Sequence, residues 1–274
     1  MRALKKVVTS SLLSGALIAV AAASASAQEQ TPYEPPTPDS SGWIVYTDVV
    51  ARSADVYTVQ GEAGEEGTCH FQDEASLAPG ESAVTVNEVA FNPDTCQSRL
   101  ASTPVAGSEE APAGNEETEA IREASAEAGS EAEAEAARAA TRSEGYLWSW
   151  YEDPPGIKVA EVANHTTWSW NGSGVLSSPG PVGNQGTRHF STSGWSLESH
   201  NWNNVYNSSQ TTSSTYAHFR NNLFCVTIDT HVYADRNTVH GQASGNLRGV
   251  WNWSKSGGCN SLLSFNHQLE RTLN

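Results

Sequence analysis

Three pairs of tryptophans have the spacing that puts two aromatic rings on one face of a β-strand. The pairs are Trp148/Trp150, Trp168/Trp170 and Trp251/Trp253, each a W-x-W triplet. Residues i and i+2 of a strand point to the same side, so each pair would form an aromatic strip. An exposed strip, with the surrounding Asn, Ser, Thr and Gln as hydrogen-bonding groups, would suit a sugar ring. A buried strip would instead build the core, because each tryptophan buries about 150–250 Å². Both interpretations stay open.

A carboxylate and an imidazole lie two residues apart in the segment LFCVTIDTHVY, residues 223–233. The segment alternates like a half-buried strand, which would place Asp229 and His231 together on its outer face. Asp235 and His240 follow closely. Such a group could orient a general base or bind a metal, so Asp229, His231 and His240 are catalytic candidates. Incidental polar residues on a solvated face would look the same. Zinc spacing such as H-E-x-x-H is absent, and we expect no metal and no cofactor.

Three further carboxylates, Glu152, Asp153 and Glu161, could form the acid pair of a glycosidase. Other catalytic motifs are missing from the sequence. There is no G-x-S-x-G nucleophile elbow and no glycine-rich phosphate loop with a lysine. The residue types therefore favour a binding protein over an enzyme, with a secreted hydrolase as the alternative.

The four cysteines indicate two disulfides, which we expect to be Cys69–Cys96 and Cys225–Cys259. Two cysteines lie on each side of a strongly acidic segment, which favours pairing within each side. Each bridge would close a loop of about 30 residues and stabilise the fold by roughly 3–4 kcal/mol. No C-x-x-C pair suggests zinc, and an exported chain meets oxidising conditions.

Short segments rich in β-branched and aromatic residues recur along the chain, bounded by Gly, Asn, Ser and Pro. Almost no helical periodicity accompanies them. This pattern predicts an all-β protein, an antiparallel sandwich or barrel. A hairpin is expected to turn near residues 244–246, with a long loop over 171–187 and a closing strand within 262–270. The other expected strands cover residues 43–50, 54–60, 83–91, 146–151, 157–164, 166–172, 195–206, 211–220 and 223–233.

Charge divides the chain more clearly than any motif. Residues 28–105 hold 13 acidic and two basic residues, residues 106–144 hold 11 and three, and residues 145–274 hold seven of each with eight of the nine tryptophans. We predict a disordered Pro-rich leader (28–42), a small β module with one disulfide (43–105), an acidic Glu/Ala-rich spacer that is disordered or partly helical (106–144), and a Trp-rich β domain (145–274). The net charge of −16 disfavours nucleic acid and anionic lipid as partners.

Residues 1–27 have the three parts of a secretory signal peptide. Arg2, Lys5 and Lys6 precede an uncharged apolar stretch over 7–23, and Ala25-Ser26-Ala27 supplies a small-x-small cleavage site. No later stretch is long and apolar enough to span a bilayer. We therefore predict a secreted, extracellular protein without a membrane span in its mature chain.

Two segments carry a resemblance to other proteins. FNPDTC (91–96) and WYEDPPGIKVAEVANHTTWSWNG (150–172) resemble small exported actinobacterial proteins of uncharacterised function, over residues 43–100 and 145–260. The resemblance implies a secreted protein and brings no catalytic residues. It also implies that the two cysteine-bearing parts occur together, as one folding unit interrupted by the acidic spacer.

Taken together, the sequence predicts a secreted, non-enzymatic β-protein that binds an extracellular ligand, with a glycan as the favoured ligand and the six paired tryptophans as candidate contacts. A cell-surface component is a second possible partner. The alternatives are a secreted hydrolase and a structural or interaction protein, such as an inhibitor, in which residues 28–144 serve as a soluble arm or pro-region.

Overall fold

The computed structural model describes residues 37–46, 55–105 and 140–273. The expected signal peptide lies outside these residues, as do most of the expected leader and residues 106–139 of the expected acidic spacer. None of the described helices is long and apolar enough to cross a membrane.

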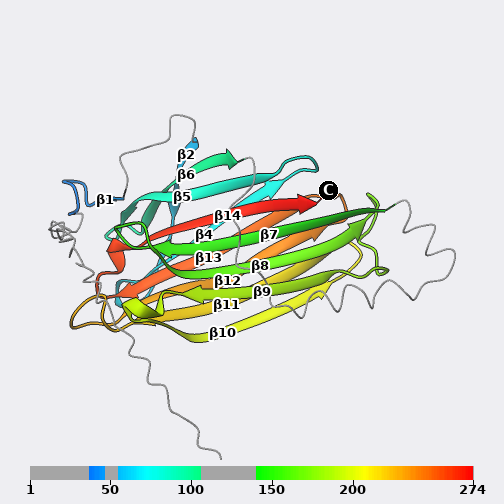
Figure 1. The fold of residues 1–274 in the computed structure, drawn as a ribbon. Coiled ribbons are helices and arrows are strands. Elements are labelled where there is room, and N and C mark those ends of the chain that lie inside the picture. The colour runs from blue at the N-terminus through cyan, green and yellow to red at the C-terminus, as the bar shows by residue number, and fades with distance from the viewer. Residues whose placement is uncertain (1–36, 47–54, 106–139, 274) are drawn as a thin grey trace, which may run out of the picture. The chain divides into compact units, whose positions relative to one another are not determined.

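Two antiparallel sheets pack against each other as the layers of a sandwich (Figure 1). One sheet has eight strands in the order β2-β6-β5-β14-β7-β8-β9, with β1 beside β5, and the other has six in the order β10-β11-β12-β13-β4-β3. The all-β antiparallel fold is confirmed, and the sheets do not close into a barrel. The eight-stranded sheet contains β1 (Ile44–Val45), β2 (Asp55–Gln60), β5 (Ala83–Asn92), β6 (Gln97–Val105), β7 (Thr141–Glu152), β8 (Lys158–Trp170), β9 (Val182–His189) and β14 (Ser264–Leu273). The six-stranded sheet contains β3 (Glu62–Ala63), β4 (Cys69–Leu77), β10 (Trp195–Tyr206), β11 (Gln210–Asn221), β12 (Thr230–Gln242) and β13 (Leu247–Gly257).

The strands that come before and after the acidic segment are interleaved in both sheets. The last strand, β14, lies between β5 and β7, and it pairs with both. In the other sheet β4 pairs with β13 along its full length, from Cys69–Lys255 to Leu77–Leu247. The described strands before and after residues 106–139 therefore contribute to both sheets.

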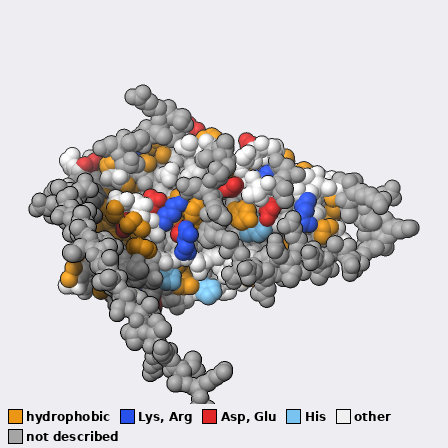
Figure 2. Space-filling model, in the orientation of Figure 1, with side chains coloured by type: hydrophobic (Ala, Val, Ile, Leu, Met, Phe, Trp, Pro, Cys, Tyr) orange, Lys and Arg blue, Asp and Glu red, His pale blue; other side chains and the backbone are white. Residues whose placement is uncertain are grey.

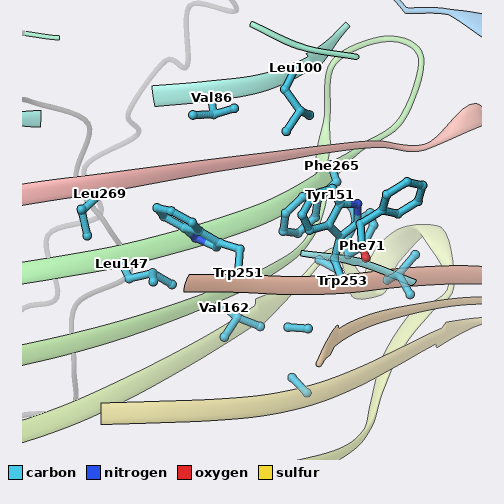
Figure 3. Packing of buried hydrophobic residues seen from close by; sticks show 14 of the residues in the cluster. Phe71, Val86, Leu100, Leu147, Tyr151, Val162, Trp251, Trp253, Phe265 and Leu269 are labelled. Carbon is cyan, nitrogen blue, oxygen red and sulfur yellow. The ribbon is translucent and has the colours of Figure 1, made fainter. Parts of the chain in front are cut away.

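An aromatic core fills the space between the sheets where β4, β13, β14 and β7 meet (Figure 3). The indole of Trp253 stacks on the rings of Phe265 and Phe71, at centroid distances of 4.6 and 5.2 Å. Trp251 packs beside it against His267, at 4.3 Å. These rings alternate along their strands with outward residues, as a half-buried strand requires.

The interior between β8, β11 and β12 is polar and closed by hydrogen bonds. The amide of Asn164 donates to the backbone oxygen of Asn237 (2.7 Å) and accepts from the hydroxyl of Thr215. Near β5 the buried ammonium of Lys255 contacts the carboxylate of Glu88 at 3.1 Å. Most buried polar groups here have a partner, which stabilises such an interior, whereas the hydroxyls of Thr166 and Thr211 have none.

Both disulfides form as predicted, Cys69–Cys96 and Cys225–Cys259. The first joins the start of β4 to the turn before β6. The second joins the loop between β11 and β12 to the turn that follows β13.

Several expected strand limits are wrong. The segment 223–229 is a loop, because Asn221 accepts hydrogen bonds from the backbone N–H groups of residues 223 and 224 and the disulfide at Cys225 holds the chain off the ladder. The two strands expected on either side of Asn164-His165 are the single strand β8. Strand β9 begins inside the expected loop 171–187, and β7 begins at Thr141, inside the expected spacer.

Candidate functional site

The outer side of the six-stranded sheet carries a nearly continuous layer of polar and aromatic side chains. Strand β11 shows why: Thr215, Ala217 and Phe219 are buried, whereas Tyr216 and His218, which alternate with them, are half exposed. Successive strand residues point to opposite sides, so the second set faces away from the core. We call the outward side chains of β4 and β10–β13 the polar face.

A depression of about 650 Å³ lies on the polar face. A second hollow of about 340 Å³ adjoins it and shares Gln72, Asp235 and Asn252 with it. Neighbouring strands lie about 4.8 Å apart, so a row across five strands spans about 19 Å. The larger depression is lined by Gln72 of β4, Asn252 of β13, Asp235 and Arg236 of β12, Tyr216 of β11 and Asn201 of β10.

A bulge in β12 lies at this depression. Three residues of β12, Asp235 to Asn237, stand opposite two residues of β13 between the pairs Ala234–Trp253 and Thr238–Val250. The extra residue changes the direction in which the neighbouring side chains point. Arg236 has a φ of 69°, a left-handed conformation that is uncommon for a residue other than glycine. The bulge is thus the local reason why Asp235 and Arg236 both line the depression.

Buried hydrogen bonds anchor the bulge to both sheets. The side chain of Asn237 donates to the hydroxyl of Ser149 on β7 (2.6 Å) and accepts from the backbone N–H of Asn252 (3.0 Å). The amide of Asn252 in turn donates to the backbone oxygen of Arg236 at 3.2 Å. A residue keeps a strained backbone conformation only where the surrounding contacts hold it there. Such residues are common at functional sites.

The charges at the depression are few and differ in their partners. The carboxylate of Asp235 accepts from the hydroxyl of Ser254 at 2.7 Å, and His70 lies 3.8 Å away. Arg236 is exposed, and within the described part of the chain no ion pair involves it. The lining therefore combines side-chain amides, a carboxylate, a guanidinium and a phenol. Such a set can donate and accept hydrogen bonds at the same time.

A stack of aromatic and imidazole rings borders the depression. The ring of His218 lies on that of Tyr233 at 4.4 Å with an interplanar angle of 13°, and its Nε2 is 2.9 Å from Nδ1 of His231. Partial burial, followed by the neighbouring His231, lowers the pKa of His218. The lowered pKa favours the neutral form of His218, and one of the two rings donates its N–H to the other.

The structure places four of the six paired tryptophans on the inner side of the sandwich. Trp251 and Trp253 lie in the aromatic core, and Trp168 is buried with its indole N–H donating to the backbone oxygen of Gln242. Trp170 is half-buried and donates to the hydroxyl of Ser143 at 2.9 Å. Each pair does share a face, as its spacing predicts, but for these two pairs that face is the interior.

The third pair, Trp148 and Trp150, lies on the opposite side of β7 from the core residues Leu147 and Tyr151. The two indoles are only 3% and 4% exposed. The ammonium of Lys158 lies 4.0 and 4.4 Å from their ring centroids. In this structure the pair is a closed cation–π cluster and offers no open platform to a ligand.

The expected catalytic group does not come together. Asp229 lies in the loop before β12 and pairs with Arg220 at 2.6 Å, while His231 contacts His218. His240 contacts the hydroxyl of Thr212. Nine residues of strand separate His231 from His240, which corresponds to about 30 Å. Asp229 precedes the strand, and its partner Arg220 stands opposite His231 in the pairing of β11 with β12.

The carboxylates considered as a glycosidase pair also have other partners. Glu161 is buried and forms a two-pronged ion pair with Arg188, at 2.5 and 2.8 Å. Glu152 accepts from the indole N–H of Trp150, and Asp153 caps the turn that ends at Ile157. Among the described residues, no group of three or more His, Cys, Asp or Glu has the arrangement to hold a metal ion.

None of the residues that line the depression is a candidate from the sequence, although Asp235 lies close to the candidates Asp229 and His231 along the chain. Gln72, Asn201 and Asn252 lie on different strands, and no local motif joins them. One available signal was the outward position of Tyr216 in the alternating segment 211–220. The bulge at Arg236 has no sequence mark of its own, since glycine or asparagine usually takes such a conformation.

Comparison with known proteins adds no family. A search of protein-family models finds no match to this chain, and a search of curated proteins finds none either.

Proposed function

We propose that this protein is a non-enzymatic ligand-binding protein that acts outside the cytoplasm and that the depression on its polar face binds a glycan. One observation carries the proposal: amide, carboxylate, guanidinium and phenol groups from five adjacent strands converge on one depression of about 650 Å³. Sugar hydroxyls both donate and accept hydrogen bonds, and these side chains together supply both donors and acceptors. The two disulfides are compatible with an oxidising, extracellular destination.

The site departs from the sequence expectation in its aromatic component. The tryptophans expected to stack on sugar rings are mostly buried. In this proposal Tyr216 contacts the sugar ring instead, and the stacked rings of His218 and Tyr233 lie beside it. An extended oligosaccharide suits the elongated shape better than a single sugar does, because the two hollows adjoin across the strands. A preformed, concave, mixed-polarity site is typical of small-ligand recognition.

The test is a binding screen of the purified chain against an array of polysaccharides and cell-wall fragments, followed by calorimetric titration of each hit. The double variant Gln72→Ala/Asn201→Ala removes two exposed side chains from opposite ends of the depression. We expect it to weaken binding by roughly tenfold or more, since each lost hydrogen bond contributes about 0.5–1.5 kcal/mol.

The matched control is Asn222→Ala, an exposed amide outside the depression, which should bind as the unmodified chain does. Circular dichroism establishes that all variants are folded. An array without hits, or a double variant with unchanged affinity for every hit, would refute the proposal.

A further inference from the structure

The loop between β11 and β12 exposes apolar side chains to an unusual degree. Leu223 is 67% exposed, Val226 93% and Ile228 58%. Single exposed aliphatic residues are ordinary, but three within six residues of one loop form a patch that calls for a partner. The proposed glycan site makes no use of this loop.

Two more exposed apolar residues lie at the same end of the sandwich. Ile157 is in the turn between β7 and β8, and Phe190 follows β9. The backbone N–H of Phe190 donates to Val159, close to that turn, and Asn221 at the base of the β11–β12 loop donates to Ser193, close to Phe190. Figure 2, drawn in the orientation of Figure 1, shows hydrophobic side chains at this end, where β9 runs into β10. We call Ile157, Phe190, Leu223, Val226 and Ile228 the apolar end.

The apolar end is held in place by the fold. Cys225 is bonded to Cys259, and the backbone N–H of Ile228 donates to the oxygen of Cys225. Phe224 turns inward against Trp195, with ring centroids 6.0 Å apart. Because the loop is already ordered, a partner that covers it does not have to supply the free energy of ordering it.

The chemistry of the apolar end fits a lipid surface better than a protein. A stable protein interface takes about 20–30 residues from each side with matched hydrogen bonds, whereas this end offers five side chains on three loops. Residues 222–228 carry no charge, and the charges at the base of the loop, Arg220 and Asp229, neutralise each other at 2.6 Å. Apolar tips above a closed polar base can enter the region between headgroups and acyl chains.

We infer that the apolar end inserts into the surface of a lipid bilayer whose headgroups are zwitterionic. The net charge of −16 opposes binding to an anionic surface, so apolar burial drives the contact. The loop tips of the apolar end then contact the bilayer, while the polar face stays in water.

The test is co-sedimentation of the full chain, with both disulfides formed, with phosphatidylcholine vesicles. We expect Val226→Asp to lower the partition coefficient by at least about tenfold, because a charge replaces the most exposed apolar side chain. The matched control is Val205→Asp, the same substitution at a 51% exposed valine near the other end of β10, and it should leave partitioning unchanged.

Three results would overturn the inference. One is an unmodified chain that stays in the supernatant of phosphatidylcholine vesicles. Another is an equal effect of both aspartate substitutions, or of neither, which would assign binding to another part of the chain. The third is binding to phosphatidylserine vesicles alone. Size-exclusion chromatography tests whether a second copy of the chain occupies this end instead. If the chain does not bind vesicles but forms a dimer that Val226→Asp dissociates, the apolar end is a self-association surface.

Discussion

At the scale of single residues, the six paired tryptophans pack against other side chains of the protein, whereas the sequence suggested that they contact a ligand. Trp251 and Trp253 face the interior, where they pack against His267 and Phe265 of β14 in the opposite sheet. The W-x-W spacing correctly indicates that two rings share a face. Whether that face is inside or outside depends on what the opposite sheet places there, and no local pattern contains that information.

Shortening the side chain of Trp253 should cause one of the largest losses in the free energy of unfolding. Its indole stacks between Phe71 and Phe265, so Trp253→Ala leaves a large cavity, and we expect a loss of about 3–5 kcal/mol in the free energy of unfolding. Trp253→Phe should cost clearly less, since it keeps one ring and removes an indole N–H that is buried without a hydrogen-bond partner. Urea denaturation monitored by circular dichroism measures both.

The matched control for this prediction is Trp202→Ala on the edge strand β10, where the indole is partly exposed. It should cost much less than Trp253→Ala. Equal losses for the two alanine variants would contradict the position of Trp253 in the core.

His267 should make stability depend on pH. Burial lowers its pKa below the ordinary 6.5, although the hydrogen bond with Asp73 at 2.9 Å and the charge of Glu88 oppose the shift. The unfolded chain therefore takes up this proton at a higher pH than the folded chain does. Stability should fall as pH drops through about 6.5 and below. Urea midpoints measured between pH 7.5 and 5 give the slope.

His267→Gln separates this effect from the other histidines, because glutamine can still donate to Asp73 but does not titrate in this range. The slope should become shallower without vanishing, since burial also lowers the pKa of His218 and His240. The exposed control His200→Gln should keep the original slope. An unchanged slope in His267→Gln would show that the buried imidazole does not titrate as expected.

At the scale of elements, the bulge in β12 links the interior to the polar face. The register on both sides of β12 shifts at Asp235–Asn237, and Asn237 reaches across the sandwich to β7. The sequence pattern predicts a strand in this region, and the structure has one. It does not predict the extra residue, because a bulge depends on the register of both neighbouring strands.

Asn237→Ala should therefore affect stability and the site together. The change leaves the hydroxyl of Ser149 and the backbone N–H of Asn252 without this partner, at about 1–3 kcal/mol for each buried group left unpaired. It also frees the bulge that directs Arg236. We expect lower urea stability and faster amide exchange at residues 235–237, measured by NMR.

The comparison variant is Asn203→Ala, an exposed amide on edge strand β10, which should alter neither property. If Asn237→Ala leaves amide exchange at the bulge as slow as before, the side chain of Asn237 is not what fixes it.

At the scale of the whole molecule, the described strands before and after residues 106–139 complete each other. Without β4, one edge of β13 has no partner, and without β5 one edge of β14 has none. The fragment 145–274 should therefore fail to fold alone. We expect no cooperative urea transition and a weak near-ultraviolet circular dichroism signal, because exposed strand edges and an open core favour aggregation.

A chain in which a Gly/Ser linker of equal length replaces residues 106–139 is the control, and it should unfold as cooperatively as the full chain does. The linker variant keeps every described strand pairing. Cooperative unfolding of the fragment 145–274 would mean that the Trp-rich segment is an independent domain after all.

The sequence by itself determined the fold class, because alternation and turn residues act over a few positions. It also determined the pairing of Cys69 with Cys96 and of Cys225 with Cys259. Strands such as 83–91 and 211–220 were predictable within two residues for the same reason. At residues 223–229 the alternating pattern predicted a strand, and this prediction was wrong. A hydrogen-bonded turn and a disulfide hold this segment as a loop.

Only the tertiary structure decided which face of each strand is inside and which distant residues meet. The depression on the polar face is lined by six residues from five strands, and no local motif joins residues of different strands. Likewise, strand β14 at the end of the chain inserts between β5 and β7. The physical reason is that sheet pairing joins residues far apart in sequence through backbone hydrogen bonds, and these bonds leave no mark on the side-chain pattern of either partner.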